Sequence, residues 1–276
     1  MLKKLIKYDF KSVFKLWWIG ALSSVVIAIA GGFAGGLYFT EWDIPEPIVV
    51  IAIFVLVLVF LGFAAFGVFS DILVYLRFYK NLFTDEGYLT FTLPAKRNTV
   101  LKSKVFLCFI NSALTALVLL IDLGIIALIA GREYWFSADF IKDFTIFVEE
   151  FFADKYYYYA FIYMVLGVIF FALLMLAAYL FAYACIAFAS MLVKKAKIAV
   201  AFGIYYGASS VLSFFMTIFY MFGLTSLINL FDRLTEFAVL NSIMMLMIMV
   251  IFMLCAACCL LYYVTLWCID RKLNLA

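Results

Sequence analysis

The chain has 276 residues, of which 70% are hydrophobic and 13% are charged, and its formal net charge is +3. Soluble globular domains are about half apolar and about a quarter charged, so this composition excludes a water-soluble fold and makes the bilayer the solvent. A helix needs about 20 apolar residues to cross the hydrocarbon core. Uncharged runs of that order recur along the whole sequence, which predicts one transmembrane domain over residues 1–276.

The first segment, residues 1–15, is predicted to be an amphipathic helix at the membrane interface. Its apolar residues recur at helical spacing on one face, and lysines occupy the rest. The apolar face continues into the first span and consists of Leu2, Leu5, Ile6, Phe10, Val13, Phe14 and Trp17. Span 1 is predicted at 16–39, where the pairs Gly31/Gly35 and Gly32/Gly36 permit close packing of helices.

Five further spans are predicted from apolar runs. They lie at 48–76, 105–130, 158–190, 198–224 and 241–268. The predicted fold class is therefore all-α, a polytopic membrane protein with six transmembrane helices plus an N-terminal amphipathic interfacial helix. The uncharged runs 156–193 and 198–231 are longer than one span and too short for two. Each is expected to be one extended helix or a helix with a re-entrant piece.

The distribution of charge predicts the orientation. The N-terminal helix, the connection 77–104, the turn 191–197 and the C-terminal tail together hold 16 of the 20 Lys and Arg residues. The loops on the other side hold 11 of the 17 acidic residues. The positive-inside rule places the basic side in the cytoplasm. Both termini are then cytoplasmic, and the connections 131–157 and 225–240 are extracellular.

The sequence has no histidine and six cysteines. Without histidine there are no Ser-His or Cys-His nucleophilic pairs, no histidine proton relay and few routes to a zinc or haem site. Cys255, Cys258 and Cys259 lie in one apolar segment that offers no charged or histidine co-ligand, and we interpret them as small packing residues. We expect no catalytic residue, metal or cofactor on this chain.

The cytoplasmic connection 77–104 is more patterned than a simple link between two spans requires. It offers a candidate helix cap at Thr84 with acidic residues after it, and Gly87 and Pro94 limit where a helix continues. Apolar residues lie beside these charges, which favours docking of a cytosolic partner. The residues predicted to dock are Thr84, Asp85, Glu86, Gly87, Tyr88, Leu89, Phe91, Leu93 and Pro94.

This segment resembles the coupling segment of ABC-2 type ATP-binding-cassette transporter permease subunits. The resemblance consists of an acidic residue near a glycine, then Leu93-Pro94, a basic residue, and Lys104 at the start of span 3. The amphipathic first helix, the six spans and the cytoplasmic ends match that family too, so the resemblance covers the whole chain. The acidic residues are closer to Gly87 than in the commoner family pattern. That spacing and the tail Lys272-Leu273-Asn274-Leu275 are similar to a subgroup from Gram-positive bacteria.

The resemblance implies a permease subunit of an ABC exporter in the bacterial cytoplasmic membrane. The substrate would be amphipathic, such as a peptide toxin, an antimicrobial peptide or a lipid-like molecule. The chain has no G-x-x-x-x-G-K-[ST] phosphate loop, so ATP and magnesium would bind to a separate ATP-binding-cassette ATPase subunit. The other expected partners are a second permease chain and membrane lipid, with no nucleic acid. The family places short external or re-entrant helices at the position of 225–240.

Asp71 and Asp122 are the only charged residues inside the predicted spans. Such residues are candidates for a functional site, because burying them in the membrane is costly. Asp71 lies about one and a half turns from the cytoplasmic end of span 2, where pairing with Arg77 or another basic residue would give it a structural role. Asp122, in the outer half of span 3, faces a translocation path or bonds to a neighbouring helix.

A second amphipathic pattern lies at 136–152, on the predicted outer side. Ser137 is a candidate helix cap, and charged residues form the polar face. The apolar face consists of Phe136, Phe140, Phe144, Phe147 and Phe151. This helix is expected to lie on the outer leaflet or to cover an exit site.

Two other functions agree with the same sequence. The first is an ATP-independent membrane protein, such as an immunity protein or a channel. The second is a proton-coupled secondary transporter that uses Asp71 or Asp122. Co-purification with an ATPase separates both from the ABC permease.

Overall fold

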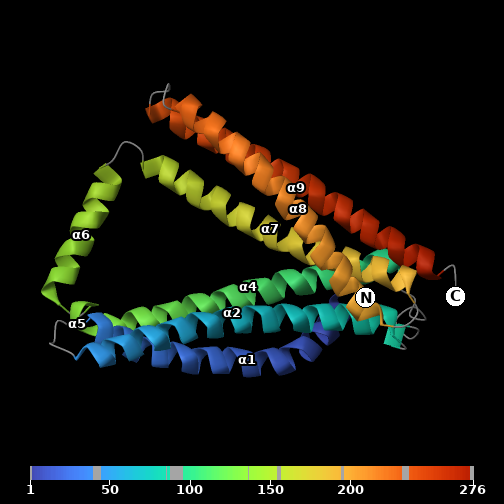
Figure 1. Ribbon diagram of the computed structural model, residues 1–276, viewed down its shortest axis with the longest axis horizontal. Helices are drawn as coiled ribbons and strands as arrows, with labels where there is room; N and C mark the ends of the chain where they lie inside the picture. The colour runs from blue at the N-terminus through green and yellow to red at the C-terminus, as the bar shows by residue number, and fades with distance from the viewer. Residues whose placement is uncertain are drawn as a thin grey trace. The chain divides into compact units, whose positions relative to one another are not determined.

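The computed structural model describes residues 2–39, 45–84, 86–87, 96–135, 137–153, 157–193, 196–231 and 236–273. These residues are helical almost throughout, and they contain no strand. The long helices are α1 (Leu2–Phe39), α2 (Glu46–Phe83), α4 (Arg97–Ala130), α7 (Tyr157–Leu192), α8 (Lys197–Phe231) and α9 (Glu236–Leu273) (Figure 1). Two short helices, α5 (Arg132–Trp135) and α6 (Ala138–Ala153), follow α4.

All six long helices contain a stretch that is long and apolar enough to cross a membrane. Each coincides with one predicted span, so the all-α class and the six spans are confirmed. The chain is a multi-pass α-helical membrane protein. The α7 and α8 helices run through the two long uncharged stretches without a break, so each stretch is one extended helix. Residues 225–231 continue α8 and residues 236–240 begin α9, in place of separate short helices.

The helices are longer than the membrane requires. The α1, α2 and α9 helices have 38 residues each, or about 57 Å at 1.5 Å per residue, against about 30 Å of hydrocarbon. The α2 helix ends at Phe83 and α4 begins at Arg97, so the helices extend into the predicted connection 77–104 and leave only 84–96 between them. Apolar residues that continue the buried faces explain this extension. They are Phe78, Leu82, Phe83, Val100 and Leu101.

The predicted interfacial helix is the first part of α1, and Figure 1 shows that α1 bends near this end. Buried positions recur every three or four residues from this part into the span, at Asp9, Val13, Trp17, Ala21, Ser24 and Ala28. This spacing is that of one helix face. Because the buried face does not stop at the predicted boundary, the N-terminal turns pack as part of a helical bundle while their lysines stay exposed.

The chain divides into two compact units. Unit 1 comprises Met1–Arg77 and Phe106–Tyr157, and unit 2 comprises Phe78–Val105 and Tyr158–Ala276. In unit 1, α1, α2 and α4 lie side by side (Figure 1). Its apolar core centres on Ala28, Val59 and Phe63, with hydrophobic residues of all three helices packed around them.

Glycines bring α1 close to its two neighbours in unit 1. A Cβ atom added to Gly32 would lie 2.7 Å from the Cβ of Ile129, and one added to Gly31 would lie 3.0 Å from the side chain of Val59. Distances this short leave no room for a side chain. The small-residue pairs of span 1 therefore form a close helix seam, as their spacing predicts.

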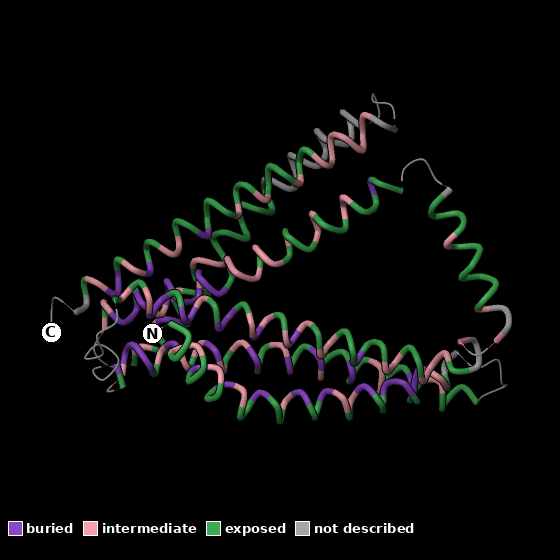
Figure 2. The backbone as a smooth tube through the Cα atoms, turned by 180° about the vertical axis from the view of Figure 1, so that it is seen from behind, coloured by how far each residue is buried: buried purple, intermediate pink, exposed green. Residues whose placement is uncertain are grey.

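The buried part of unit 2 includes the C-terminal half of α7. Nearly all buried positions of α7 fall between Tyr179 and Ser190. The ring of Tyr183 stacks on Phe78, with the ring centroids 3.7 Å apart, and this contact fixes the end of α2 against α7. Most described residues of α8 and many of α9 are exposed (Figure 2), as expected for apolar helices whose outer faces meet lipid.

Candidate functional site

The first candidate site is the end of unit 2 at which α2 stops and α4 starts. The hydroxyl group of Thr84 donates a hydrogen bond to the carbonyl oxygen of Lys80, 2.5 Å away. The N–H group of Gly87 donates to the carbonyl oxygen of Thr84 at 2.8 Å. The Thr84 side chain thus closes the last turn of α2. Residues 86–87 after it are helical, and a cap of that helix by Thr84 stays a prediction.

Gly87 lies where the chain folds back on the end of α2. It is buried, and a Cβ atom added to it would lie 2.8 Å from the carbonyl oxygen of Leu82 and 3.0 Å from the carbonyl carbon. Backbone atoms cannot move aside as a flexible side chain can. Only glycine fits at this close approach of the backbone.

Contacts from three other helix ends converge on the same region of unit 2. The Nζ atom of Lys197, at the start of α8, donates to the carbonyl oxygen of Phe83 at 3.2 Å. The Nη1 atom of Arg97 lies 2.9 Å from Oδ1 of Asp270, near the end of α9. The side chain of Asn98 accepts a hydrogen bond from the hydroxyl group of Tyr262.

We call this region the basic end and define it by the residues that make these contacts and close α2: Phe83, Thr84, Gly87, Arg97, Asn98, Lys197, Tyr262 and Asp270. Three segments that carry the predicted cytoplasmic charge meet there. The basic end therefore joins the start of α4, the start of α8 and the end of α9 to the connection predicted to dock a partner.

Six of the predicted docking residues, Asp85, Tyr88, Leu89, Phe91, Leu93 and Pro94, lie outside the described residues. The other three are described at the basic end: Thr84 is half-buried, Glu86 is exposed and Gly87 is buried. An exposed acidic side chain beside a glycine with a fixed backbone is a local geometry that a protein partner can recognise.

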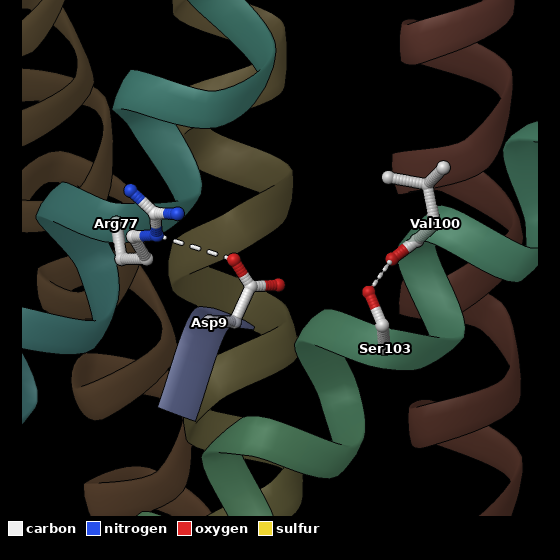
Figure 3. Close-up of polar contacts among 4 residues, drawn as sticks. All are labelled: Asp9, Arg77, Val100 and Ser103. Carbon is white, nitrogen blue, oxygen red and sulfur yellow. Dashed lines mark hydrogen bonds and ion pairs between the residues drawn. The ribbon is translucent and has the colours of Figure 1, made fainter. Parts of the chain in front are cut away.

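The second candidate site is a buried polar stripe in unit 1. At one end of it, Nε of Arg77 on α2 lies 3.1 Å from Oδ1 of Asp9 on α1 (Figure 3). The Asp9 side chain is only 4% exposed. Sequence reasoning considered Asp71 as the partner of Arg77 and did not single out Asp9. Asp71 itself is half-buried and interacts with another residue.

Four buried side chains join α1, α2 and α4 in the next layer of the stripe. The indole N–H of Trp17 donates to Oγ1 of Thr115 at 3.1 Å, and the hydroxyl groups of Thr115 and Ser70 lie 2.7 Å apart. The Nδ2 atom of Asn111 donates to Oγ of Ser70 at 2.8 Å. Hydrogen bonds between membrane helices hold them in a fixed register, and this cluster does so for all three.

Asp122 occupies the third layer, on α4. It is fully buried, and neither carboxyl oxygen has a hydrogen-bond partner in the structure. The polar group that interacts with it is the hydroxyl of Ser24 on α1. That hydroxyl donates to the carbonyl oxygen of Ala21 at 2.9 Å.

The sequence does contain a signal for this stripe. On α4, Asn111, Thr115 and Asp122 are separated by four and seven residues, which places them on one helix face. A search for polar residues at this spacing inside a span would have found the cluster. Its partners on α1 and α2 are a tryptophan and a serine, residue types that occur in membrane helices for many reasons.

The helix predicted at 136–152 is present as α6, and its predicted cap is confirmed. The N–H group of Phe140 donates to Oγ of Ser137 at 3.2 Å. Phenylalanine rings of α6 stack in pairs along one face, and most described side chains of α6 are exposed. An exposed amphipathic helix of this kind suits a membrane surface.

The three cysteines of α9 do not form a metal site in the described part of the chain, which contains no group of three or more metal-ligating side chains. Cys255 and Cys259 are exposed, and Cys258 is buried, with its sulfur atom 3.8 Å from the carbonyl oxygen of Leu173. Comparison of the chain with family models, curated proteins and solved structures gave no match.

Proposed function

We propose that this chain is the permease subunit of an ATP-driven ABC exporter in the bacterial cytoplasmic membrane. The observation that carries the proposal is the patterned connection between α2 and α4. Its sequence resembles a coupling segment, and its ends contact the start of α8 and the end of α9 through Lys197 and Arg97. A force applied to such a connection acts on several transmembrane helices at once.

In the proposed mechanism, the connection docks on a separate ATPase subunit that binds ATP and magnesium. Closure of two ATPase subunits pushes on the basic ends of two permease chains, identical or homologous. The contacts at Phe83, Arg97 and Asn98 pass the movement to α8 and α9, and the two permeases alternate between inward and outward access. The substrate is an amphipathic molecule such as a peptide toxin, an antimicrobial peptide or a lipid-like compound.

The test is co-expression with an ATP-binding-cassette ATPase encoded beside this chain, followed by affinity purification and an ATPase assay. We expect a stable complex. Glu86→Ala and Leu93→Ala should reduce recovery of the ATPase at least several-fold, because they alter the docking segment. Gly87→Ala should do the same by displacing the fold-back on Leu82.

The matched control is Glu149→Ala, which removes an exposed acidic side chain of α6 on the predicted outer side. It should leave ATPase recovery unchanged. The ABC permease would be excluded if the chain purifies alone and still transports substrate in vesicles without ATP. Equal recovery with the Glu86 and Glu149 variants would exclude Glu86 from the docking contact.

A further inference from the structure

Asp122 is an acidic side chain without a counter-ion in its part of unit 1. Apart from Asp122 itself, the sequence has no charged residue on α1 between Lys15 and Glu41, and none on α4 between Lys104 and Arg132. Lys15 precedes Ser24 by nine residues and Arg132 follows Asp122 by ten, which is about 14–15 Å along a helix in each case.

The facing helix α2 supplies no cation either. Its sequence has no charge between Glu46 and Asp71. Asp71 follows Ser70, whose partner Thr115 precedes Asp122 by seven residues, or about 10 Å. As an acid, Asp71 cannot neutralise a second carboxylate. The groups that face Asp122 from α1 and α2 are therefore uncharged.

The three helices are in direct contact on both sides of Asp122. On one side, the hydrogen bonds of Thr115 tie α4 to α1 and α2. On the other, Gly32 packs directly against Ile129. A fully buried, ionised carboxylate without a partner is strongly disfavoured in such a place. A neutral carboxyl group avoids this cost by keeping its proton.

We propose that Asp122 is a proton-binding site enclosed by α1, α2 and α4. While the three helices are packed as described, the carboxyl group holds a proton. It exchanges that proton with water only when α1 and α4 separate. The site lies within unit 1 and does not depend on the ABC permease proposal.

The test is reaction of the purified full-length chain with dicyclohexylcarbodiimide, an apolar reagent that modifies protonated carboxyl groups, read by peptide mass spectrometry. From about pH 5 to about pH 8, carboxyl groups with ordinary pKa values are ionised. We expect Asp122 to be labelled throughout this range. The exposed Glu149 is the reference carboxyl group for the same measurement.

Two variants complete the test. Asp122→Asn should fold like the wild type and lose the adduct at this position. Gly32→Ala, which pushes α1 away from Ile129, should admit water to Asp122 and make its labelling fall with rising pH. A wild-type profile parallel to that of Glu149, or absence of label at Asp122 in both the wild type and Gly32→Ala at pH 5, would overturn the proton site. A Gly32→Ala profile identical to the wild type would overturn its enclosure by α1 and α4.

Discussion

Thr115 makes two of the hydrogen bonds that join the helices of unit 1, one with Trp17 on α1 and one with Ser70 on α2. Both partners are themselves buried. Removing the Thr115 hydroxyl leaves the indole N–H of Trp17 without this acceptor in a place that water does not reach. The consequence is a specific loss of stability and not a general effect of a polar substitution.

We predict that Thr115→Val lowers the free energy of unfolding by about 1–2 kcal/mol, since membrane hydrogen bonds are worth about 0.6 kcal/mol on average and up to about 1.7. The measurement is an unfolding titration in mixed micelles. The matched control is Thr265→Val, which removes a fully buried hydroxyl bonded at 2.7 Å to Leu261 within its own helix. Thr265→Val should lower the free energy of unfolding clearly less than Thr115→Val. Equal decreases would show that the hydrogen bonds between helices do not add to the stability.

Individual residues were predictable where a local rule applies. The Ser137 cap follows from residue type and position alone. The pair of Asp9 and Arg77 was not predictable, because 68 residues separate the partners and Asp9 lies in a segment expected to lie on the membrane surface. The partners of Thr115 were hidden for the same reason, since no local pattern tells which face of α1 meets α4.

The seam between α1 and α4 depends on glycine over a whole helix face. Gly32 allows the backbone of α1 to approach Ile129, and Gly35 allows it to approach Ala130. The helices pack directly at these points, so added volume must push them apart. A displacement of one helix then affects every layer of the polar stripe.

Gly32→Ala should destabilise the protein by about 1–3 kcal/mol, as expected for an overpacked interface. Gly124→Ala on α4 is the control, because a Cβ atom at Gly124 would meet nothing within 4 Å. That substitution should be neutral, or stabilising by up to about 1 kcal/mol through helix propensity. Thermal unfolding of the two variants in one detergent gives the comparison. If both variants unfold at the same temperature as the wild type, the seam between α1 and α4 is not close-packed.

The existence and order of the long helices were predictable from hydropathy, because a span of about 20 apolar residues is a strong signal. Their lengths were not. Hydropathy marks where the hydrocarbon ends, whereas α2 and α4 continue as long as residues such as Phe78 and Leu101 stay buried. That burial depends on tertiary neighbours, so the boundaries of the connection between α2 and α4 came only from the structure.

The whole chain combines two compact units with a strongly asymmetric charge distribution. The basic end gathers the starts of α4 and α8 and the end of α9, which is consistent with the charge count that placed these segments on one side of the membrane. The amphipathic α6 helix with its acidic residues belongs to a connection predicted for the opposite side. This arrangement gives a direct prediction of topology.

We predict that a cysteine at Glu149 is labelled by a membrane-impermeant maleimide in intact cells. A cysteine at Lys102, an exposed position of α4, should be labelled only after the membrane is opened. The wild-type chain, whose six cysteines lie in the transmembrane helices, serves as the blank. Labelling of the Lys102 variant in intact cells would contradict the predicted orientation and would place the docking segment outside the cell.

The polar stripe of unit 1 also bears on how the protein is made. Trp17 leaves the ribosome 98 residues before its partner Thr115, and Asp9 leaves it 68 residues before Arg77. During synthesis, α1 therefore enters the membrane with polar groups that have no partner. Its lysine-rich first turns can hold it at the membrane surface, on the side predicted to be cytoplasmic. The hydrogen bond between Trp17 and Thr115 can form only after α4 has been made.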